Sequence, residues 1–282
     1  MASFSPGQID LHLHAGQERD QPIDKLVQDF VDHGITFLGL LDHSELYSMG
    51  DRELKAKFGQ LVYHSTPRGL QDFYGDVEKL REKHRGEASI FKGMELPEWE
   101  ILTTDSKLLE RVDFLGCHMN TSCHDPTYRH YIKSTCGEHL ATRAKQLLEL
   151  CLPMGKPAIL FHPFHRRVQE LCSIVRDGGD LGSQEIFDEQ DVDYLIENVE
   201  VEHLYVELNF GDIYHAATDD GIVELLGRTC RRLRAGGIGF SLGSDYHRTP
   251  DAFRNPEADG ILASLGVGIE DFTIAAREHS YD

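Results

Sequence analysis

Two histidines near the start of the chain are spaced so that they could hold one metal ion together. His12 and His14 lie in residues 8–14, whose sequence QIDLHLH alternates between polar and apolar residues over most of its length. Alternate side chains of a β-strand point to the same face, so two such imidazoles would lie about 6.5–7 Å apart along the strand. Imidazole is a common ligand of divalent first-row metals. The pair therefore predicts part of a metal site that other residues must complete.

Residues able to bind metals or hold protons also follow or end six later apolar runs. They are Asp42 and His43, Glu95, His118, His162, Glu207 and Asn209, and Asp245 and His247. Histidines with only structural roles are not expected to choose the ends of apolar runs so consistently. The pattern predicts one polynuclear metal site assembled from many segments.

The elements that would position these residues are seven short, mostly apolar runs. They cover residues 8–14, 35–41, 88–94, 112–117, 157–161, 204–209 and 238–243. Nearly continuous apolar runs are typical of strands buried on both faces of a parallel sheet. Helical patterns separate most of the runs, over residues 23–33, 72–84 and 138–150 and near Leu108. A long polar connection between His43 and residue 72 is expected to lie over the site.

Alternating strands and helices predict a parallel sheet, either a barrel or a doubly wound sheet. In βα-barrels the active site forms at the carboxyl ends of the strands. Because the candidate ligands stand at that end of their strands, the barrel is the better explanation.

Composition limits the function further. The chain has 282 residues, with 28 basic and 48 acidic residues and a formal net charge of −20. Residues 1–282 are expected to form one domain, since α/β barrels reach this length. The acidic balance disfavours nucleic acid and anionic membranes as partners, and a phosphate substrate would require bound cations. With no C-x-x-C pair, signal peptide or membrane-spanning run in the sequence, a cytoplasmic protein with reduced thiols is expected.

The ordered set of motifs resembles the PHP (polymerase and histidinol phosphatase) superfamily. The set comprises DLHLH at 10–14, Asp42-His43, Gly93-Met94-Glu95, His118, His162-Pro163 and Ser244-Asp245-Tyr246-His247. The similarity is greatest to the histidinol-phosphate phosphatase branch, which residues 93–95, 112–118, 207–209 and 242–245 resemble. The resemblance implies a distorted TIM-like (β/α)7 barrel of the α/β class.

The resemblance also implies two to three divalent metal ions, of Zn, Mn or Fe. It places the first metal on His12, His14 and Asp245, the second on His118 and His162, and Glu95 as the bridge between them. His43 and His247 would hold the third metal with a residue from the loop after His14. Asp20 is the best match for that residue by spacing, and Glu18 is the alternative.

The activity implied by the resemblance is hydrolysis of a small phosphorylated metabolite. A metal-bridging hydroxide would attack a phosphate monoester, with L-histidinol phosphate as the leading candidate. Asp245 or His247 would handle the leaving-group proton. A guanidinium suits the phosphate, and Arg166, Arg167 and Arg248 follow strand-end motifs on the expected site face.

The sequence leaves other functions open. The same superfamily includes phosphatases and phosphodiesterases of nucleotides, and exonucleases, although the chain lacks a basic track for nucleic acid. Amidohydrolase barrels also begin with His-x-His but use a strand-end lysine, where this chain has Glu95. A non-catalytic metal-binding module is a further alternative, and the sequence leaves the oligomeric state open.

Overall fold

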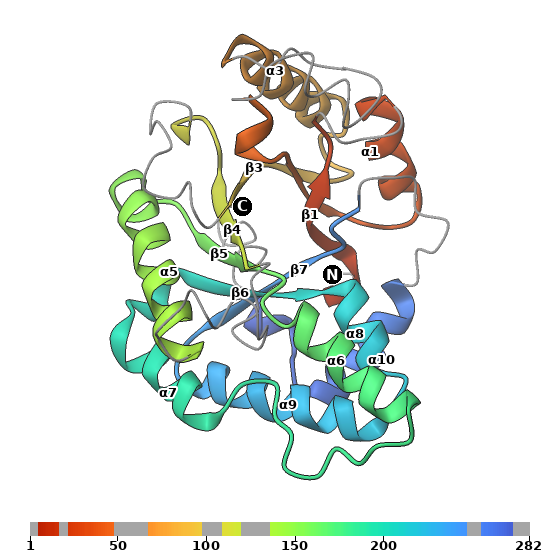
Figure 1. Ribbon diagram of the computed structural model, residues 1–282. Coiled ribbons are helices and arrows are strands. Elements are labelled where there is room, and N and C mark those ends of the chain that lie inside the picture. The colour runs from red at the N-terminus through yellow and green to blue at the C-terminus, as the bar shows by residue number, and fades with distance from the viewer. Residues whose placement is uncertain are drawn as a thin grey trace.

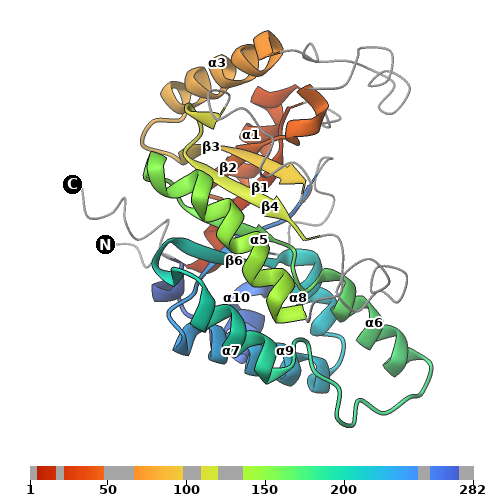
Figure 2. The same ribbon diagram turned by 60° about the vertical axis from the view of Figure 1, so that its left-hand side comes forward.

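Seven parallel strands form the centre of the molecule (Figure 1). The computed structural model describes residues 5–16, 22–47, 67–97, 109–119, 136–246 and 255–272. The strands are β1 (Ile9–His14), β2 (Phe37–Leu41), β3 (Ser89–Pro97), β4 (Phe114–His118), β5 (Ala158–Phe161), β6 (Leu204–Asn209) and β7 (Gly239–Gly243). They are ordered β1-β2-β3-β4-β5-β6-β7, and neighbouring strands pair in parallel. Their carboxyl ends therefore meet at one end of the sheet, as the arrowheads of β3 and β4 show in Figure 2.

Helices connect the strands and surround them (Figures 1 and 2). They are α1 (Ile23–Asp32), α3 (Pro67–Lys83), α5 (Cys136–Cys151), α6 (His165–Arg176), α7 (Glu189–Asn198), α8 (Phe210–Ala216), α9 (Asp220–Ala235) and α10 (Asn255–Leu265). Short 3-10 turns cover Pro6–Gln8, Ser44–Tyr47, Leu152–Met154, Val201–His203 and Ile269–Asp271. Among the described residues, no helix has both the length and the apolar character needed to cross a membrane.

The barrel closes between β1 and the residues just beyond β7. Tyr246 forms a parallel bridge with Leu13. The Asp245 N–H donates to the His12 carbonyl at 2.8 Å, and the His14 N–H donates to the Tyr246 carbonyl at 3.0 Å. These bonds lie at the carboxyl ends of both strands. The closed part of the barrel is therefore the part that carries the polar side chains.

A β-bulge lies in the segment of β1 that carries His12. Residues 10–13 of β1 face residues 38–40 of β2, so three steps along one strand match two along the other. Such a bulge bends the strand and changes where its side chains point. Gly39 lies opposite the bulge, and a Cβ there would lie 2.5 Å from the Leu11 carbonyl oxygen. Glycine at this position gives the bulged strand room to approach its neighbour.

The seven predicted strands and the barrel class are confirmed, with small shifts in strand bounds. The apolar stripe expected in residues 23–33 is buried in α1. Residues 67–71 were expected in the long polar connection but form the first turn of α3, where Pro67 is well tolerated. The rest of that connection from residue 48 to 66, and the helix expected near Leu108, lie outside the described residues.

Candidate metal centre

Seven polar side chains meet at the carboxyl end of the barrel. They come from β1, from β3 and β4, and from the residues that follow β2, β5 and β7. They are His12, His14, His43, Glu95, His118, His162 and Asp245. Each was predicted from the sequence as a metal ligand, and the structure brings all seven together.

One oxygen of the buried Glu95 carboxylate faces three imidazoles. Glu95 Oε2 lies 3.4 Å from His12 Nε2 and 3.3 Å from His14 Nε2. His43 Nδ1 lies 3.2 Å from the same oxygen. The backbone keeps these two side chains close, because His43 and Glu95 also form an isolated parallel bridge.

The other oxygen of Glu95 faces a different pair of imidazoles. Oε1 lies 3.4 Å from His118 Nδ1 and 3.3 Å from His162 Nε2. Glu95 has no exposed surface, so water cannot replace these neighbours as partners of the carboxylate. The carboxylate therefore stands between two groups of nitrogen ligands.

Asp245 completes the side of the cluster next to β1. Its Oδ1 lies 3.0 Å from His14 Nε2 and 3.4 Å from His12 Nε2. The two Nε2 atoms are themselves 3.2 Å apart. Three ligand atoms thus surround one small volume at the end of the barrel.

Three groups of these side chains are compact enough to hold a metal ion. Within each group the ligand atoms lie within 4.8 Å of one another. The groups are His12, His14 and Asp245; His12, Glu95 and His162; and His14, His43 and Glu95. Because the groups share members, the described residues form one continuous cluster of ligands.

The chemistry of the cluster fits first-row divalent cations. Imidazole nitrogens and carboxylate oxygens are ligands of Zn, Mn and Fe. Two ring nitrogens that face each other at 3.2 Å need a proton or a cation between them, because their lone pairs repel. His12 Nδ1 is already bonded to Glu207 at 2.8 Å, which leaves Nε2 as the ligand atom of this ring.

The electrostatics of the cluster favour bound positive charge. Burial disfavours the charged form of His12, but three neighbouring carboxylates outweigh burial and raise its pKa well above the ordinary value. Burial would likewise raise the pKa of Glu95, yet the imidazoles of His43 and His12 hold it well below its ordinary value. An arrangement that stabilises protonated rings beside ionised carboxylates would also stabilise a divalent cation.

Two of the ligand candidates have a strained backbone. Within the described ranges, His162 and Asp245 are the non-glycine residues with positive φ, at 35° and 56°. This conformation costs about 1–3 kcal/mol for residues with a Cβ and is concentrated at functional sites. Both strained residues belong to the same cluster, which is the pattern expected where function determines the backbone.

Glu207 also belongs to the site. The sequence predicted that it ends a strand but gave it no role there. Its Oε1 accepts from His12 Nδ1 at 2.8 Å, and its Oε2 accepts from the His162 N–H at 2.7 Å. Asn209, two residues further, instead caps α8 by accepting from the Gly211 N–H at 2.8 Å. The spacing of the Glu207-x-Asn209 motif could not distinguish these roles.

Asp10 was not predicted as a site residue. Its Oδ1 accepts from the His12 N–H at 3.2 Å and from the Ser244 N–H at 3.0 Å. Its side chain is fully buried, and burial raises its pKa to about 7 against the hydrogen bonds that lower it. The signal in the sequence was its place two residues before His12, on the same face of an ideal strand.

A histidine–aspartate pair lies beside the cluster. His165 begins α6, and its Nδ1 lies 2.7 Å from Oδ1 of the buried Asp212 in α8. The ring centroids of His165 and His162 are 6.4 Å apart. The hydrogen bond to Asp212 raises the pKa of His165. Nothing in the sequence pattern singled out Asp212.

The predicted phosphate-binding arginines differ in their surroundings. Arg166 is exposed in the first turn of α6. Arg167 is nearly buried, and it donates to the Glu185 carbonyl at 2.8 Å and to Gln184 Oε1 at 2.6 Å. Arg248 lies outside the described residues, as do the predicted ligands His247 and Asp20 and the alternative Glu18.

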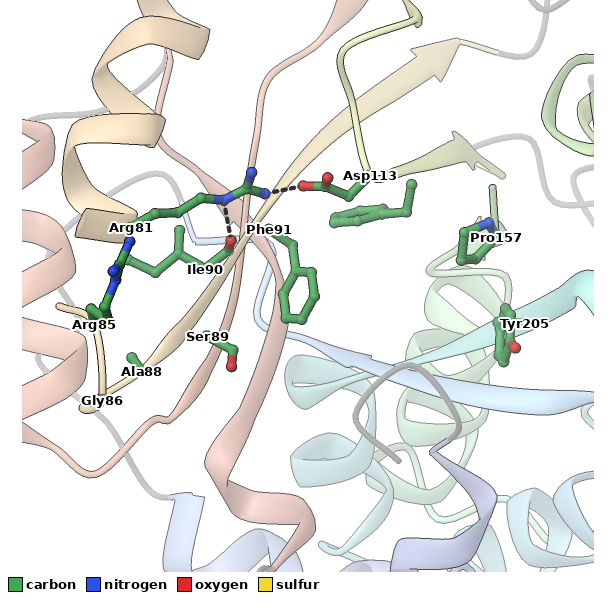
Figure 3. Close-up of a pocket in the computed structure, with 11 residues that line it drawn as sticks. Arg81, Arg85, Gly86, Ala88, Ser89, Ile90, Phe91, Asp113, Pro157 and Tyr205 are labelled. Atoms are coloured by element: carbon green, nitrogen blue, oxygen red, sulfur yellow. Dashed lines mark hydrogen bonds and ion pairs between the residues drawn. The ribbon is translucent and has the colours of Figure 1, made fainter. Parts of the chain in front are cut away.

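A cavity of about 620 Å³ lies away from the cluster, near the amino ends of β3 and β6 (Figure 3). Phe91, Phe114 and Tyr205 line it, beside Arg81 of α3. Arg81 is bonded to Asp113 and to a backbone carbonyl at the rim. None of the predicted ligands that the structure describes lines this cavity, so the cavity is separate from the candidate metal centre.

Comparison of the sequence with protein-family models and with curated proteins found no match. Solved structures do match. One is a candidate histidinol phosphatase, hisK, from Listeria monocytogenes, with a TM-score of 0.52 and 14% identity. The match covers 88% of this chain and 98% of hisK. This match confirms that the chain shares the barrel fold of hisK.

Two further structures are less similar, and both are candidate 2-pyrone-4,6-dicarboxylic acid hydrolases. The protein from Acinetobacter baumannii has a TM-score of 0.45 and 13% identity, covering 93% of this chain and 96% of its own. The protein from Pseudomonas putida has a TM-score of 0.42 and 15% identity, covering 93% of this chain and 91% of its own.

Proposed function

We propose that this chain is a metal-dependent phosphoesterase that hydrolyses a small-molecule phosphate monoester. The observation that carries the proposal is the position of Glu95. One of its oxygens faces His12, His14 and His43, and the other faces His118 and His162. A buried carboxylate with ligands on both sides is suited to bridge two cations.

Divalent cations at such a site supply the chemistry that phosphate ester hydrolysis needs. When bound, they would polarise the phosphoryl oxygens, provide hydroxide at neutral pH and offset charge on the attacking and leaving oxygens. They would also make the charge at the site positive in a chain whose net charge is −20. Without that positive charge, the carboxylates of the cluster would repel a phosphate dianion.

The ligands divide into sets around Glu95 in this proposal. His12, His14 and Asp245 would hold one metal, His118 and His162 a second, and Glu95 would bridge them. His43 would contribute to a third metal with His247 and with Asp20 or Glu18. Two to three ions of Zn, Mn or Fe are therefore proposed.

Asp245 and His247 are the candidates to supply the leaving-group proton in this proposal. Burial would raise the pKa of Asp245, but the imidazoles of His12 and His14 outweigh burial and lower it. An ionised Asp245 that binds a metal through one oxygen holds no proton to give to a leaving group. His247 is therefore proposed as the donor to the leaving group.

Arginine side chains are proposed to bind the substrate phosphate. Arg166 is exposed and lies four residues after His162 in the chain. Arg248 follows His247 in the chain. Arg167 was an equal candidate from the sequence, but its guanidinium donates to residues 184–185 and pairs with Glu170. Arg166 is preferred to Arg167 because its side chain is exposed at the start of α6, and Arg248 stays a candidate because it follows His247 in the sequence.

L-histidinol phosphate is the leading substrate, because both the sequence motifs and the fold of hisK support that class. The test is phosphate release by purified protein whose metal content has been measured. The substrates compared are L-histidinol phosphate, sugar phosphates, nucleoside monophosphates and a phosphodiester.

Each outcome of this experiment has a defined meaning. Preference for L-histidinol phosphate with two or three metals per chain is the expected result. Turnover of other monoesters alone would retain the chemistry and replace the substrate. Bound metal without cleavage of any phosphoester would overturn the proposal and favour amide hydrolysis or a binding role.

A further inference from the structure

We propose that Asp10 and Glu207 are positioning residues that hold the metal ligands in place without binding metal themselves. Each of these buried carboxylates joins His12 to one of the two strained turns of the site. Glu207 joins it to the turn at His162, and Asp10 joins it to the turn at Asp245. The inference rests on the proposed metal-binding function of the cluster.

Glu207 uses both of its oxygens for this purpose. Oε1 accepts from the ring of His12 at 2.8 Å, and Oε2 accepts from the backbone N–H of His162 at 2.7 Å. His162 has a φ of 35°, so its backbone needs an external contact to hold this conformation. One side chain from β6 thereby orients a ligand of β1 and a ligand that follows β5.

Asp10 uses a single oxygen. Oδ1 accepts from the backbone N–H groups of His12 and Ser244, at 3.2 and 3.0 Å. Ser244 precedes Asp245, whose φ is 56° and whose N–H donates to the His12 carbonyl at 2.8 Å. Asp10 therefore stabilises the turn that directs Asp245 toward the cluster.

Burying a carboxylate costs free energy unless hydrogen bonds replace its lost hydration. Neither Asp10 nor Glu207 has exposed surface, and buried carboxylates are retained where their hydrogen bonds compensate for lost hydration. All four described hydrogen bonds go to ligands or to the residue beside a ligand. Among the described residues, neither carboxylate belongs to a group of side chains able to surround a metal.

The two residues differ in how they tolerate replacement of the carboxylate by an amide. A metal on Nε2 of His12 keeps the ring proton on Nδ1, where it needs an acceptor. Glutamine at position 207 has one acceptor oxygen for two N–H donors, so its amide N–H groups would face a donor. Asparagine at position 10 retains the one oxygen that accepts both described bonds.

The experiment compares metal binding by the full-length wild-type protein with metal binding by four variants, Glu207→Gln, Glu207→Asp, Asp10→Asn and Asp10→Ala. Zn²⁺ or Mn²⁺ affinity is measured by titration of chelator-stripped protein, and the visible spectrum of the Co²⁺-loaded protein reports ligand geometry. Circular dichroism and thermal melting of the metal-free proteins report folding. Ser241→Ala is the matched control, because Ser241 is buried on β7 and its hydroxyl has no described hydrogen bond.

We expect Glu207→Gln and Glu207→Asp to lower metal affinity by about 10–100-fold and to change the Co²⁺ spectrum. Aspartate keeps the charge but is too short to reach both donors, so it separates geometry from charge. Asp10→Asn is expected to bind metal as the wild type does, whereas Asp10→Ala loses about 10-fold or more.

Three results would overturn the inference. If a folded Glu207→Gln protein bound metal with wild-type affinity, Glu207 would not be needed to position the metal ligands. Equal losses of metal affinity in Asp10→Asn and Asp10→Ala would show that metal binding depends on the charge of Asp10 and not on the hydrogen bonds that it accepts. If Glu207→Gln does not fold, wild-type affinity in Glu207→Asp is the deciding result against Glu207. Failure of the wild-type protein to bind any divalent cation would instead overturn the proposed function, together with this inference.

Discussion

Gly243 lies so close to Glu207 that a Cβ on the glycine would sit 2.2 Å from Glu207 Oε1. The same Cβ would lie 2.3 Å from the Cβ of His12. Gly243→Ala is therefore expected to displace Glu207 and destabilise the protein by about 1–3 kcal/mol, the usual range for overpacking. Denaturant unfolding measures the loss.

Gly75→Ala is the matched control for this change. Gly75 lies in the middle of α3, and a Cβ there would meet no heavy atom within 4 Å. Alanine is the better helix former by about 0.5–1 kcal/mol, so this variant is expected to be as stable as the wild type or more stable. Equal stability of Gly243→Ala and Gly75→Ala would contradict the packing described at Gly243.

Removal of one ligand is expected to abolish activity without unfolding the barrel. His12→Ala deletes the ring that contacts Glu95, Glu207 and Asp245. Phosphoesterase activity should fall by more than about 100-fold, the upper range for residues that only support ligands. His33→Ala, at an exposed position after α1, is the control and should retain activity. Full activity of a folded His12→Ala protein would contradict the proposed site.

The barrel could be predicted from the sequence because two periodic signals agree. Apolar runs such as residues 35–41 are typical of strands buried on both faces of a sheet, and helical spacing separates most of them. The hydrogen bonds that close the barrel could not be predicted. They join Asp245 and His14 to partners more than two hundred residues away, and local spacing carries no information on such pairs.

The ligand candidates could be predicted because their side chains stand at strand ends and parallel strands share one end. The residues that hold them could not. Glu207 stands at a strand end as the ligands do, and its role follows from the two N–H groups that it meets. Likewise, Arg166 and Arg167 are adjacent in sequence, and only the path of α6 shows which one is bonded to residues 184–185.

That difference between adjacent arginines gives a further prediction. Arg166→Ala is expected to raise the KM for a phosphate monoester and to lower thermal stability less than Arg167→Ala does, because Arg166 is exposed and Arg167 is nearly buried. Arg167→Ala should lower stability by about 1–3 kcal/mol, the range for hydrogen bonds of a charged group, with little change in KM. Steady-state kinetics and thermal melting on both variants distinguish the roles. The reverse pattern would assign the phosphate contact to Arg167.

Chelation is expected to remove activity and lower the melting temperature together. Ions that bind only the folded state add about 2.7 kcal/mol of stability at a free concentration about 100 times Kd. The measurement is activity and melting after dialysis against a chelator, then after return of Zn²⁺, Mn²⁺ or Fe²⁺ one at a time. Recovery of both properties with the same ion identifies the metal that the enzyme uses. Full activity after complete metal removal would contradict metal-dependent hydrolysis.

Protons and metal ions should compete for His12 and His162, which gives metal affinity a defined pH dependence. Burial lowers both pKa values, but neighbouring carboxylates outweigh burial and raise each above the ordinary 6.5. The rings therefore hold protons to a higher pH than free histidine does. Metal affinity is expected to increase as pH rises from about 6 to 9, because ligands must lose their protons before they bind.

In the metal-free protein, stability should change in the opposite direction over the same interval. The two raised imidazole pKa values stabilise the fold fully below pH 6.5 and lose that contribution as pH rises through the folded-state values. The raised pKa of Asp10 also makes the fold less stable as pH rises, between the ordinary value of 3.8 and about 7. The lowered pKa of Glu95 affects stability only as pH falls below 4.5. Thermal melting of chelated protein should therefore decline from about pH 6 to 9, while calorimetric titration shows tighter metal binding. Parallel trends in the two measurements would contradict the charge arrangement around His12 and Glu95.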